Sequence, residues 1–269
     1  MPTVDPTKQA KRFLDAYGGN LEAAIDALRQ ASAGEVRRPK RAATGPVLIS
    51  AENLSKQYKV GKQHVAALDN VTLEIRQGEF VAFTGPSGSG KSTLLQLIGG
   101  LDKPSQGVVT VDGQNLTSLS DRKLSDFRNK TIGFVFQFFY LQPFLNLKTN
   151  LTVPAIFART NRRERAVAAE QLAEAVGLAD RLQHLPKEMS GGQMQRAAIA
   201  RALLNKPKLI LADEPTGNLD SVNGKAIVEL FEKVRKDFGT TIIVVTHDPK
   251  VAAHADREVV LHDGKVVAQ

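Results

Sequence analysis

One run in the sequence has residue types and spacing suited to holding a string of phosphate groups. It follows the pattern G-x-x-x-x-G-K-[ST] between an apolar strand-like segment and an apolar helix-like segment. Small residues let successive backbone N–H groups converge on phosphate oxygens, and the following helix adds the positive end of its dipole. We expect Lys91 to reach the β- and γ-phosphates, the Ser92 hydroxyl to ligate Mg²⁺, and Thr93 to add an α-phosphate contact. The alternative is a Gly/Ser turn that binds nothing. The run consists of Gly85, Pro86, Ser87, Gly88, Ser89, Gly90, Lys91 and Ser92.

Two adjacent carboxylates follow a second strand-like segment, the apolar run LILA at 209–212. A carboxylate at the carboxyl end of a parallel strand lies where ligands bind in open α/β sheets. Asp213 suits a place on Mg²⁺, through water, because Mg²⁺ keeps several of its waters in proteins. Glu214 suits general-base work on a water that attacks the γ-phosphate. An acidic pair after a strand can also begin a helix, but the phosphate loop in the same chain favours the catalytic interpretation.

Three further motifs complete the set of chemically useful residues. Gln137 follows an apolar run at 131–136, and His247 follows another at 241–245. A four-residue run opens a helix-like segment: Ser190, Gly191, Gly192 and Gln193. The same run fits a capping box, S-x-x-Q, and the two interpretations are compatible because a capped helix N-terminus is itself an anion site.

The elements that must position these residues alternate between strands and helices from residue 47 onward, which predicts an α/β core with a parallel sheet. We expect a helix from Lys91 to about Ile98 and a helix-rich stretch over 140–205. A hairpin is expected at 258–267, with Asp263 and Gly264 at its turn. The expected strands are 47–54, 71–75, 79–84, 108–111, 131–136, 209–212 and 241–245.

In this order, the motifs resemble those of the ATP-binding subunits of ATP-binding-cassette (ABC) transporters. The resemblance covers about 47–269, including the run PTGNLD after the acidic pair. It is nearest to the branch that holds lipoprotein-releasing, macrolide-export and cell-division ATPases. The segments that carry it are GPSGSGKSTLLQLIGGLDKPSQG, IGFVFQ, MSGGQMQRAAIARAL, ADEPTGNLDS and VVTHD. The resemblance implies a P-loop NTPase fold: a parallel-sheet core, an antiparallel β subdomain, and an α-helical subdomain at about 138–205.

The resemblance also implies the reaction, hydrolysis of ATP to ADP and phosphate, and a head-to-tail homodimer around two ATP molecules. Each ATP would lie between the phosphate loop of one chain and the 190–193 run of the other. Ser190 and Gly192 would touch the γ-phosphate across the dimer. Asp220 would help to couple the two sites.

Three more roles follow from the resemblance alone. Gln137 would sense Mg²⁺ and the attacking water, and His247 would contact the γ-phosphate and hold Glu214 in place. A histidine after a strand is usually structural, so its role depends on the family match. Tyr58 matches the aromatic residue that stacks on adenine, although it also fits an ordinary half-buried strand tyrosine.

An aromatic-rich segment and the composition bear on partners. Five of the 12 Phe fall in 134–144. We expect Phe134 and Phe136 to pack on alternate faces of a strand. We expect residues 138–147 to form a groove for a short helix of a separately encoded membrane permease, and not to be part of the hydrophobic core. Two departures from the family are small: Met189 replaces the usual Leu, and Asn150-Leu151 stands where the family more often has an acidic residue and then Asn-Val. The chain has no Cys, which excludes disulfides, thiolate zinc sites and iron–sulfur clusters.

No apolar run approaches the roughly 18 residues of a membrane span, and no secretory signal is evident, so we expect a cytoplasmic protein, peripheral on the inner face of the membrane. Residues 1–31 indicate a helical hairpin of unknown role and 32–46 a basic linker. One alternative is an ABC ATPase that signals to an extracytoplasmic hydrolase without transport. Another is a nucleic-acid-associated ABC ATPase, prompted by the net charge of +8, although we expect no nucleic-acid partner.

Overall fold

The computed structural model describes residues 45–61 and 63–269 of the chain. The hairpin expected at 1–31 and nearly all of the linker expected at 32–46 lie outside the described residues. Both therefore stay predictions.

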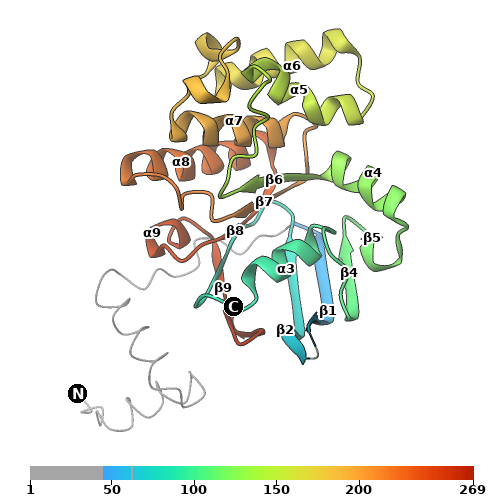
Figure 1. The fold of residues 1–269 in the computed structure, drawn as a ribbon. Helices are drawn as coiled ribbons and strands as arrows, with labels where there is room; N and C mark the ends of the chain where they lie inside the picture. Colours follow the sequence, from blue (N-terminus) through green and yellow to red (C-terminus); the bar gives the residue numbers. More distant parts are fainter. Residues whose placement is uncertain (1–44, 62) are drawn as a thin grey trace, which may run out of the picture. The chain divides into compact units, whose positions relative to one another are not determined.

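A six-stranded sheet forms the centre of the described part, with the strand order β10-β9-β3-β8-β7-β6 (Figure 1). All neighbours in it pair in parallel except β10 and β9, which form an antiparallel hairpin. Every residue of β8 is buried, because helices or the second sheet cover both faces, as the continuous apolar run predicted. The strands are β3 (Phe80–Thr84), β6 (Ile132–Phe136), β7 (Leu209–Asp213), β8 (Thr241–Val245), β9 (Arg257–His262) and β10 (Lys265–Ala268).

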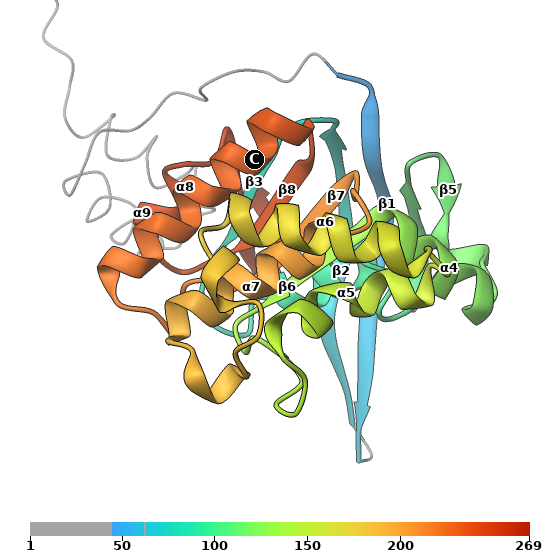
Figure 2. The same cartoon turned by 90° about the horizontal axis from the view of Figure 1, so that it is seen from above.

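A second, antiparallel sheet has the order β2-β1-β4-β5. Its first two strands are much longer than the apolar runs at 47–54 and 71–75 predicted, and Figure 2 shows their tips extending past the helical layer. The added length is mostly polar and exposed, so the hydrophobic pattern did not reveal it. The strands are β1 (Val47–Val60), β2 (Gln63–Arg76), β4 (Gln106–Val111) and β5 (Gln114–Asn115).

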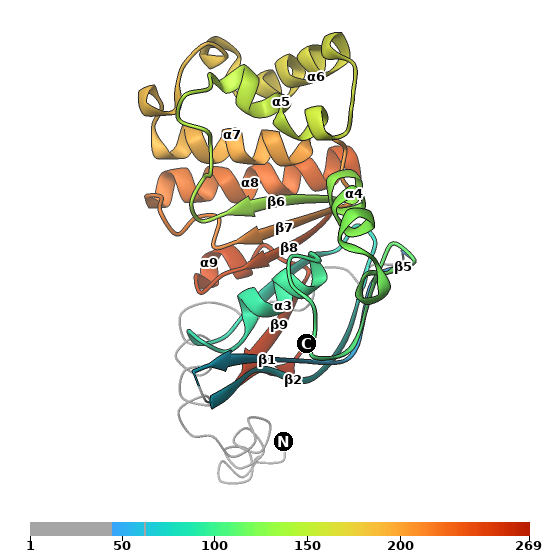
Figure 3. The ribbon, with the colours of Figure 1, turned by 45° about the vertical axis from the view of Figure 1, so that its right-hand side comes forward.

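The helices form layers on the two sides of the core sheet (Figure 3). Between the sheets lies α3 (Lys91–Ile98), and α4 (Asp121–Thr131) leads into β6. On the other side lie α7 (Gly191–Leu203), α8 (Ser221–Phe238) and α9 (Pro249–Ala252). The helix-rich stretch is completed by α5 (Leu147–Phe157) and α6 (Arg162–Ala175), with the short 3-10 turns η2 (Ala179–Arg181) and η3 (Pro186–Glu188); η1 (Leu116–Ser118) follows β5.

Alternation along the strands divides the core into separate clusters. In β3, Val81 and Phe83 face α3 and the antiparallel sheet, whereas Phe80 and Ala82 face α7 and α8. A third cluster joins α5, α6 and α7. The parallel sheet is thus held rigidly from both faces, and its carboxyl edge, where the chemically useful residues follow the strands, is fixed in place.

One expectation about β6 was wrong. Phe134 and Phe136 lie on the same face, with stacked rings whose centroids are 5.8 Å apart. Side chains two residues apart in a strand point the same way, so alternate faces were impossible for this pair.

Candidate functional site

The phosphate loop lies between β3 and α3, where the sequence placed it. Gly85 and Gly90 have φ angles of 131° and 99°, which are strained for any residue with a Cβ. A Cβ on Gly85 would lie 2.0 Å from the carbonyl oxygen of Leu261, and one on Gly90 would lie 2.5 Å from that of Ala67. The loop is therefore packed against β2 and β9 so closely that glycine is required.

Lys91 occupies the first position of α3 and folds back over the loop. Its Nζ donates to the carbonyl oxygens of Gly85 at 2.9 Å and Pro86 at 2.8 Å. Burial lowers the pKa of Lys91, while the charges of Asp213 and Glu214 oppose that shift. The ammonium is thus already at the mouth of the loop, held by carbonyls that an anionic ligand can replace as acceptor.

Ser92 and Asp213 meet across 121 residues of sequence. The Ser92 hydroxyl donates to Asp213 Oδ1 at 3.0 Å. Burial raises the pKa of Asp213, and the nearby Glu214 carboxylate adds to the increase, while Ser92 and Lys91 oppose it. A hydroxyl and a carboxylate that the sequence assigned to one metal ion therefore lie together at the carboxyl edge of the sheet.

Glu214 is held in an unusual backbone conformation directly after β7. Its φ is 46°, in the left-handed region that non-glycine residues rarely adopt. Its N–H donates to the carbonyl of Val245 at 3.0 Å, and its carbonyl accepts from Gly217 at 3.1 Å. The side-chain Oε1 lies 2.8 Å from Nδ1 of His247, which is itself 74% exposed. The expected pairing of Glu214 with His247 is thus present.

Gln137, the first residue after β6, contacts a different part of the edge. The Gln137 Nε2 donates to Asn218 Oδ1 at 3.3 Å, and Asn218 Nδ2 donates to the backbone carbonyl of Gln137 at 2.9 Å. The structure therefore ties Gln137 to the turn that follows Glu214 instead of to Ser92 or Asp213.

The run at 190–193 forms the N-terminus of α7 with both bonds of a capping box. Ser190 Oγ accepts from the Gln193 N–H at 3.3 Å, and Gln193 Oε1 accepts from the Ser190 N–H at 2.9 Å. A Cβ on Gly192 would lie 2.4 Å from Oδ1 of Asn223, so this glycine lets α7 approach α8 closely. Asp220 caps α8 by accepting from the N–H of Asn223 at 2.9 Å.

Comparisons with known proteins agree with this geometry. A family model described as ABC transporter matches residues 68–217. The ATP-binding protein YknY of Bacillus subtilis is 49% identical over 82% of this chain and 95% of its own length. The lipoprotein-releasing system ATP-binding protein LolD of a Shewanella species (strain MR-4) is 46% identical over 82% and 96%. A solved dimer of the ATP-binding cassette MJ0796 in a post-hydrolysis state, bound to ADP and phosphate, has a TM-score of 0.76 and 44% identity, covering 81% of this chain and 96% of that one.

The chain belongs to the ABC transporter family. It is an ATP-binding subunit of an ABC transporter and an ABC-type ATPase, as the motifs predicted. The described residues contain no helix long and apolar enough to cross a membrane.

Tyr58 of this cassette lies on β1 and is half-buried, so its position fits both interpretations of it. Its hydroxyl donates to Asp102 Oδ2 at 2.9 Å. Asp102 was not singled out in the sequence, because it lies 44 residues away from Tyr58 and no local spacing links the two.

The signature helix α7 of the cassette carries two more residues that sequence reasoning missed. Gln195 is completely buried, and its Nε2 donates to the carbonyl of Pro215 at 2.7 Å and to that of Phe136 at 3.4 Å. Arg201 donates to the carbonyls of Phe139 at 2.9 Å and Tyr140 at 2.5 Å. The signal available in the sequence was a polar residue among the alanines of an Ala-rich helix.

Proposed function

We propose that this cassette binds MgATP between two copies of itself, hydrolyses it, and thereby drives a separately encoded permease that exports lipoproteins, peptides or drugs. The proposal depends on one observation: three pairs of groups suited to nucleotide chemistry lie together at the carboxyl edge of the core sheet. These are the glycine loop with Lys91, Ser92 with Asp213, and Glu214 with His247. The names of the relatives YknY and LolD support a membrane-coupled role.

The residues at this edge fit a magnesium ion carried in by the nucleotide. Mg²⁺ is usually held by one or two carboxylates together with substrate phosphates and waters. Asp213 supplies one carboxylate and Ser92 one hydroxyl, and the described residues contain no group of three or more His, Cys, Asp or Glu that would form a complete cage. Ser92 would bind the ion directly and Asp213 through water, with Gln137 swinging from Asn218 to join them. The bound ion would supply charge neutralisation at the phosphates.

The chain's own groups would do the remaining chemistry. The backbone N–H groups of 85–92 and the Lys91 ammonium would hold the β- and γ-phosphates. The buried Ser89 hydroxyl has no hydrogen-bond partner among the described residues, which suits a loop built to face acceptor oxygens. Glu214 would polarise the attacking water, and His247 would fix the Glu214 carboxylate and contact the γ-phosphate.

Closure of the dimer would complete each site. The N-terminus of α7, capped by Ser190 and Gln193, offers its dipole and free donors to an anion, and the MJ0796 cassette is dimeric in two solved structures. Ser190 and Gly192 would contact the γ-phosphate bound by the partner. Asp220, at the start of the adjacent α8, would link the two sites. Because the closed dimer needs the γ-phosphate, hydrolysis would release it.

A pair of variants tests this proposal on the purified chain. Glu214→Gln should bind ATP and accumulate as an ATP-loaded dimer with hydrolysis nearly lost, measured by size-exclusion chromatography with light scattering. Adding Ser190→Arg should keep nucleotide binding but leave a monomer, whereas Lys91→Ala should weaken nucleotide binding itself. Wild-type turnover in Glu214→Gln, or a stable dimer in the double variant, would contradict the assignment.

The permease would dock on the segment that follows Gln137. Phe138, Tyr140 and Phe144, here called the aromatic segment, are 64%, 63% and 74% exposed. Exposed apolar side chains of this size commonly mark a protein contact. We assign this segment to a short permease helix, which would place the cassette on the inner face of the membrane.

A further inference from the structure

We propose that Asp102 is a positioning residue for the nucleotide base: it anchors the hydroxyl of Tyr58, so that the tyrosine ring is held ready for adenine. The inference rests on the proposed function, to which the family resemblance adds an adenine contact by Tyr58. It adds a residue that no motif in the sequence marks.

The Asp102 carboxylate is fully engaged. Oδ2 accepts from the Tyr58 hydroxyl at 2.9 Å, while Oδ1 accepts from Lys56 Nζ at 2.7 Å and from the backbone N–H of Lys103 at 2.7 Å. Lys56 Nζ also donates to the carbonyl of Lys103 at 2.7 Å. Three of these four bonds tie β1 to the turn after α3, and the fourth lies within the turn, so the tyrosine hydroxyl has a fixed acceptor.

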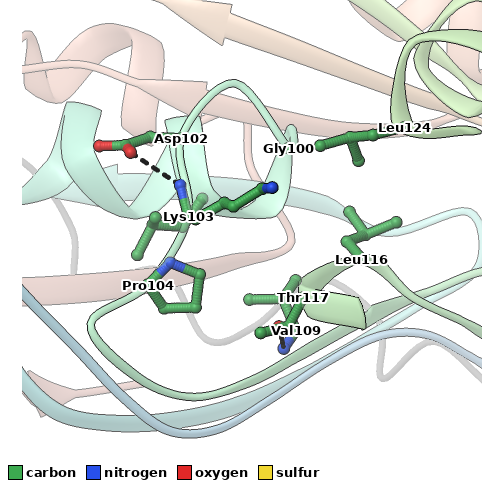
Figure 4. A pocket seen from close by; sticks show the side chains of 9 residues that line it. Gly100, Asp102, Lys103, Pro104, Val109, Leu116, Thr117 and Leu124 are labelled. Carbon is green, nitrogen blue, oxygen red and sulfur yellow. Dashed lines mark hydrogen bonds between the residues drawn. The ribbon is translucent and has the colours of Figure 1, made fainter. Parts of the chain in front are cut away.

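That turn is itself rigid. Leu101 N–H donates back to Gln96 in α3 at 2.9 Å, and Arg128 of α4 donates to the Gly100 carbonyl at 2.6 Å. Figure 4 shows Asp102 and Lys103 above a small hollow between this turn and η1. Its volume of about 10 Å³ has room for about one water molecule.

The same helix connects the two halves of the nucleotide site. The first residue of α3 is Lys91 of the phosphate loop, and the turn beyond its last residue carries Asp102. A helix of eight residues is about 12 Å long and stiff. The distance between the phosphate-binding groups and the Tyr58 anchor is therefore fixed by a single element.

Lys56 covers one face of the Tyr58 ring. Its Nζ lies 4.9 Å from the centroid of the Tyr58 ring, which is a cation–π contact, and the Lys56 side chain is only 12% exposed. With an ammonium over one face, the opposite face is the one available to a base.

The protonation states suit this arrangement. Burial and the hydrogen bond to Asp102 raise the pKa of Tyr58, so the phenol remains a donor. Burial alone would raise the pKa of Asp102, but hydrogen bonds from Lys56, the Lys103 N–H and Tyr58 lower it overall, so the acceptor is a carboxylate. The bond is therefore charge-assisted at neutral pH.

A ring that is already fixed loses less side-chain freedom when a base stacks on it. Removing the anchor should weaken base binding by about 3- to 10-fold in Kd and leave phosphate binding unchanged. Isothermal titration of the full chain with MgADP and, separately, with magnesium pyrophosphate measures the two contributions. MgADP avoids turnover and lacks the γ-phosphate that closes the proposed dimer.

Four variants define the test. Asp102→Ala and Tyr58→Phe should each weaken MgADP binding, and the double variant should be no weaker than Asp102→Ala, because both changes remove the Tyr58–Asp102 bond. Asp102→Asn, which keeps an acceptor oxygen, should recover part of the loss. Asp121→Ala is the matched control: its carboxylate pairs with the same Lys103, at 2.9 Å, on an exposed surface. MgADP affinity in this control should equal that of the wild type.

Each other outcome has one meaning. Unchanged MgADP affinity in Asp102→Ala, an equal loss for pyrophosphate, or additive losses in the double variant would overturn the inference. If Asp102→Ala fails to fold, Tyr58→Phe removes the same bond from the other side without touching the turn, and its unchanged MgADP affinity would overturn the inference alone. Unchanged MgADP affinity in Tyr58→Ala would instead show that the adenine assignment of the proposed function is wrong.

Discussion

Glu214 and His247 are the pair of side chains to which we assign the hydrolysis step, and they lie in direct contact. Glu214 sits at a strained φ of 46°, yet its backbone is bonded at both ends, so its carboxylate direction is set by β7 and β8. His247 Nδ1 completes the arrangement at 2.8 Å. As the proposed general base, Glu214 held this way would need little reorganisation when the γ-phosphate arrives.

His247→Ala should therefore lower kcat for ATP hydrolysis by about 10²-fold, because the freed Glu214 samples unproductive rotamers. The Kd for MgADP should change less than twofold, since the phosphate loop is intact. Steady-state kinetics measures kcat, and titration calorimetry measures the Kd for MgADP. A matched control is His254→Ala, which breaks an ion pair with Glu232 of similar length, 2.8 Å, on α8. Equal kcat values in the two variants would show that the Glu214 contact is without consequence.

At the residue scale, the sequence predicted those contacts that lie within a motif. The phosphate loop and the Ser190–Gln193 cap follow from local spacing alone. The Tyr58–Asp102 bond and the Gln195 bonds join residues far apart in sequence; the first links two side chains and the others link a side chain to backbone carbonyls, and no local pattern of residue types encodes either.

At the scale of elements, α7 holds together the segments that carry the catalytic residues. Gln195 donates to the carbonyl of the residue before Gln137 and to that of the residue after Glu214. Arg201, further along the same helix, holds the carbonyls of Phe139 and Tyr140. A shift of α7 must therefore move Gln137 and Glu214 together.

Gln195→Met keeps the volume and removes the donor, which leaves two buried carbonyls without this hydrogen bond. We expect kcat to fall at least 10-fold through misplacement of Glu214, with the Kd for MgADP within twofold of wild type. ATPase assays and calorimetry on the same preparation measure both. Gln114→Met, on the exposed strand β5, is the control for the added methionine. A normal kcat in Gln195→Met would mean that α7 does not position the catalytic edge.

A buried ion pair fixes α8 to the start of β3. Arg235 lies 2.6 Å from Asp256, and the same carboxylate accepts from the N–H of Phe80 at 3.0 Å. Asp256→Ala should lower the free energy of unfolding by roughly 3 kcal/mol, about 6–12 °C in Tm, because Arg235 is left partly buried and unpaired. Differential scanning calorimetry of the nucleotide-free chain measures this change. Asp121→Ala, in a pair whose side chains are 56% and 90% exposed, should shift Tm far less.

The core elements were predictable because burial leaves a clear pattern. The strands β7 and β8 are continuous apolar runs, and α3 was predicted with the bounds Lys91 to Ile98 that the structure has. The outer halves of β1 and β2 were missed because they alternate weakly and stay exposed. The 18-residue α8 was not predicted either. Its apolar residues lie among charged residues, and the run PTGNLD before it was interpreted only as part of the nucleotide-site motif.

At the scale of the whole molecule, the proposed nucleotide site and the proposed permease contact lie on different segments of the described chain. The catalytic edge lies in the core sheet, whereas the aromatic segment lies between β6 and α5 and is tied back by Arg201. This arrangement suits a protein in which a change at the nucleotide site is transmitted to a partner bound at the aromatic segment.

Phe138→Ser combined with Phe144→Ser should abolish co-purification with the proposed permease partner, because two large apolar contacts are lost. ATPase activity of the cassette alone should stay within threefold of wild type. Phe238→Ser, at a similarly exposed phenylalanine of α8, is the control. Undiminished co-purification in the double variant would place the permease elsewhere.

The hairpin between β9 and β10 has a consequence for how the molecule is made. The Gly264 N–H donates to the Ser89 carbonyl at 3.1 Å, and the Leu261 carbonyl presses against Gly85. On the ribosome, a nascent chain that has already exposed residues 85–92 still lacks these supports. We therefore expect competence to bind nucleotide to arise late, once residue 264 has emerged from the exit tunnel.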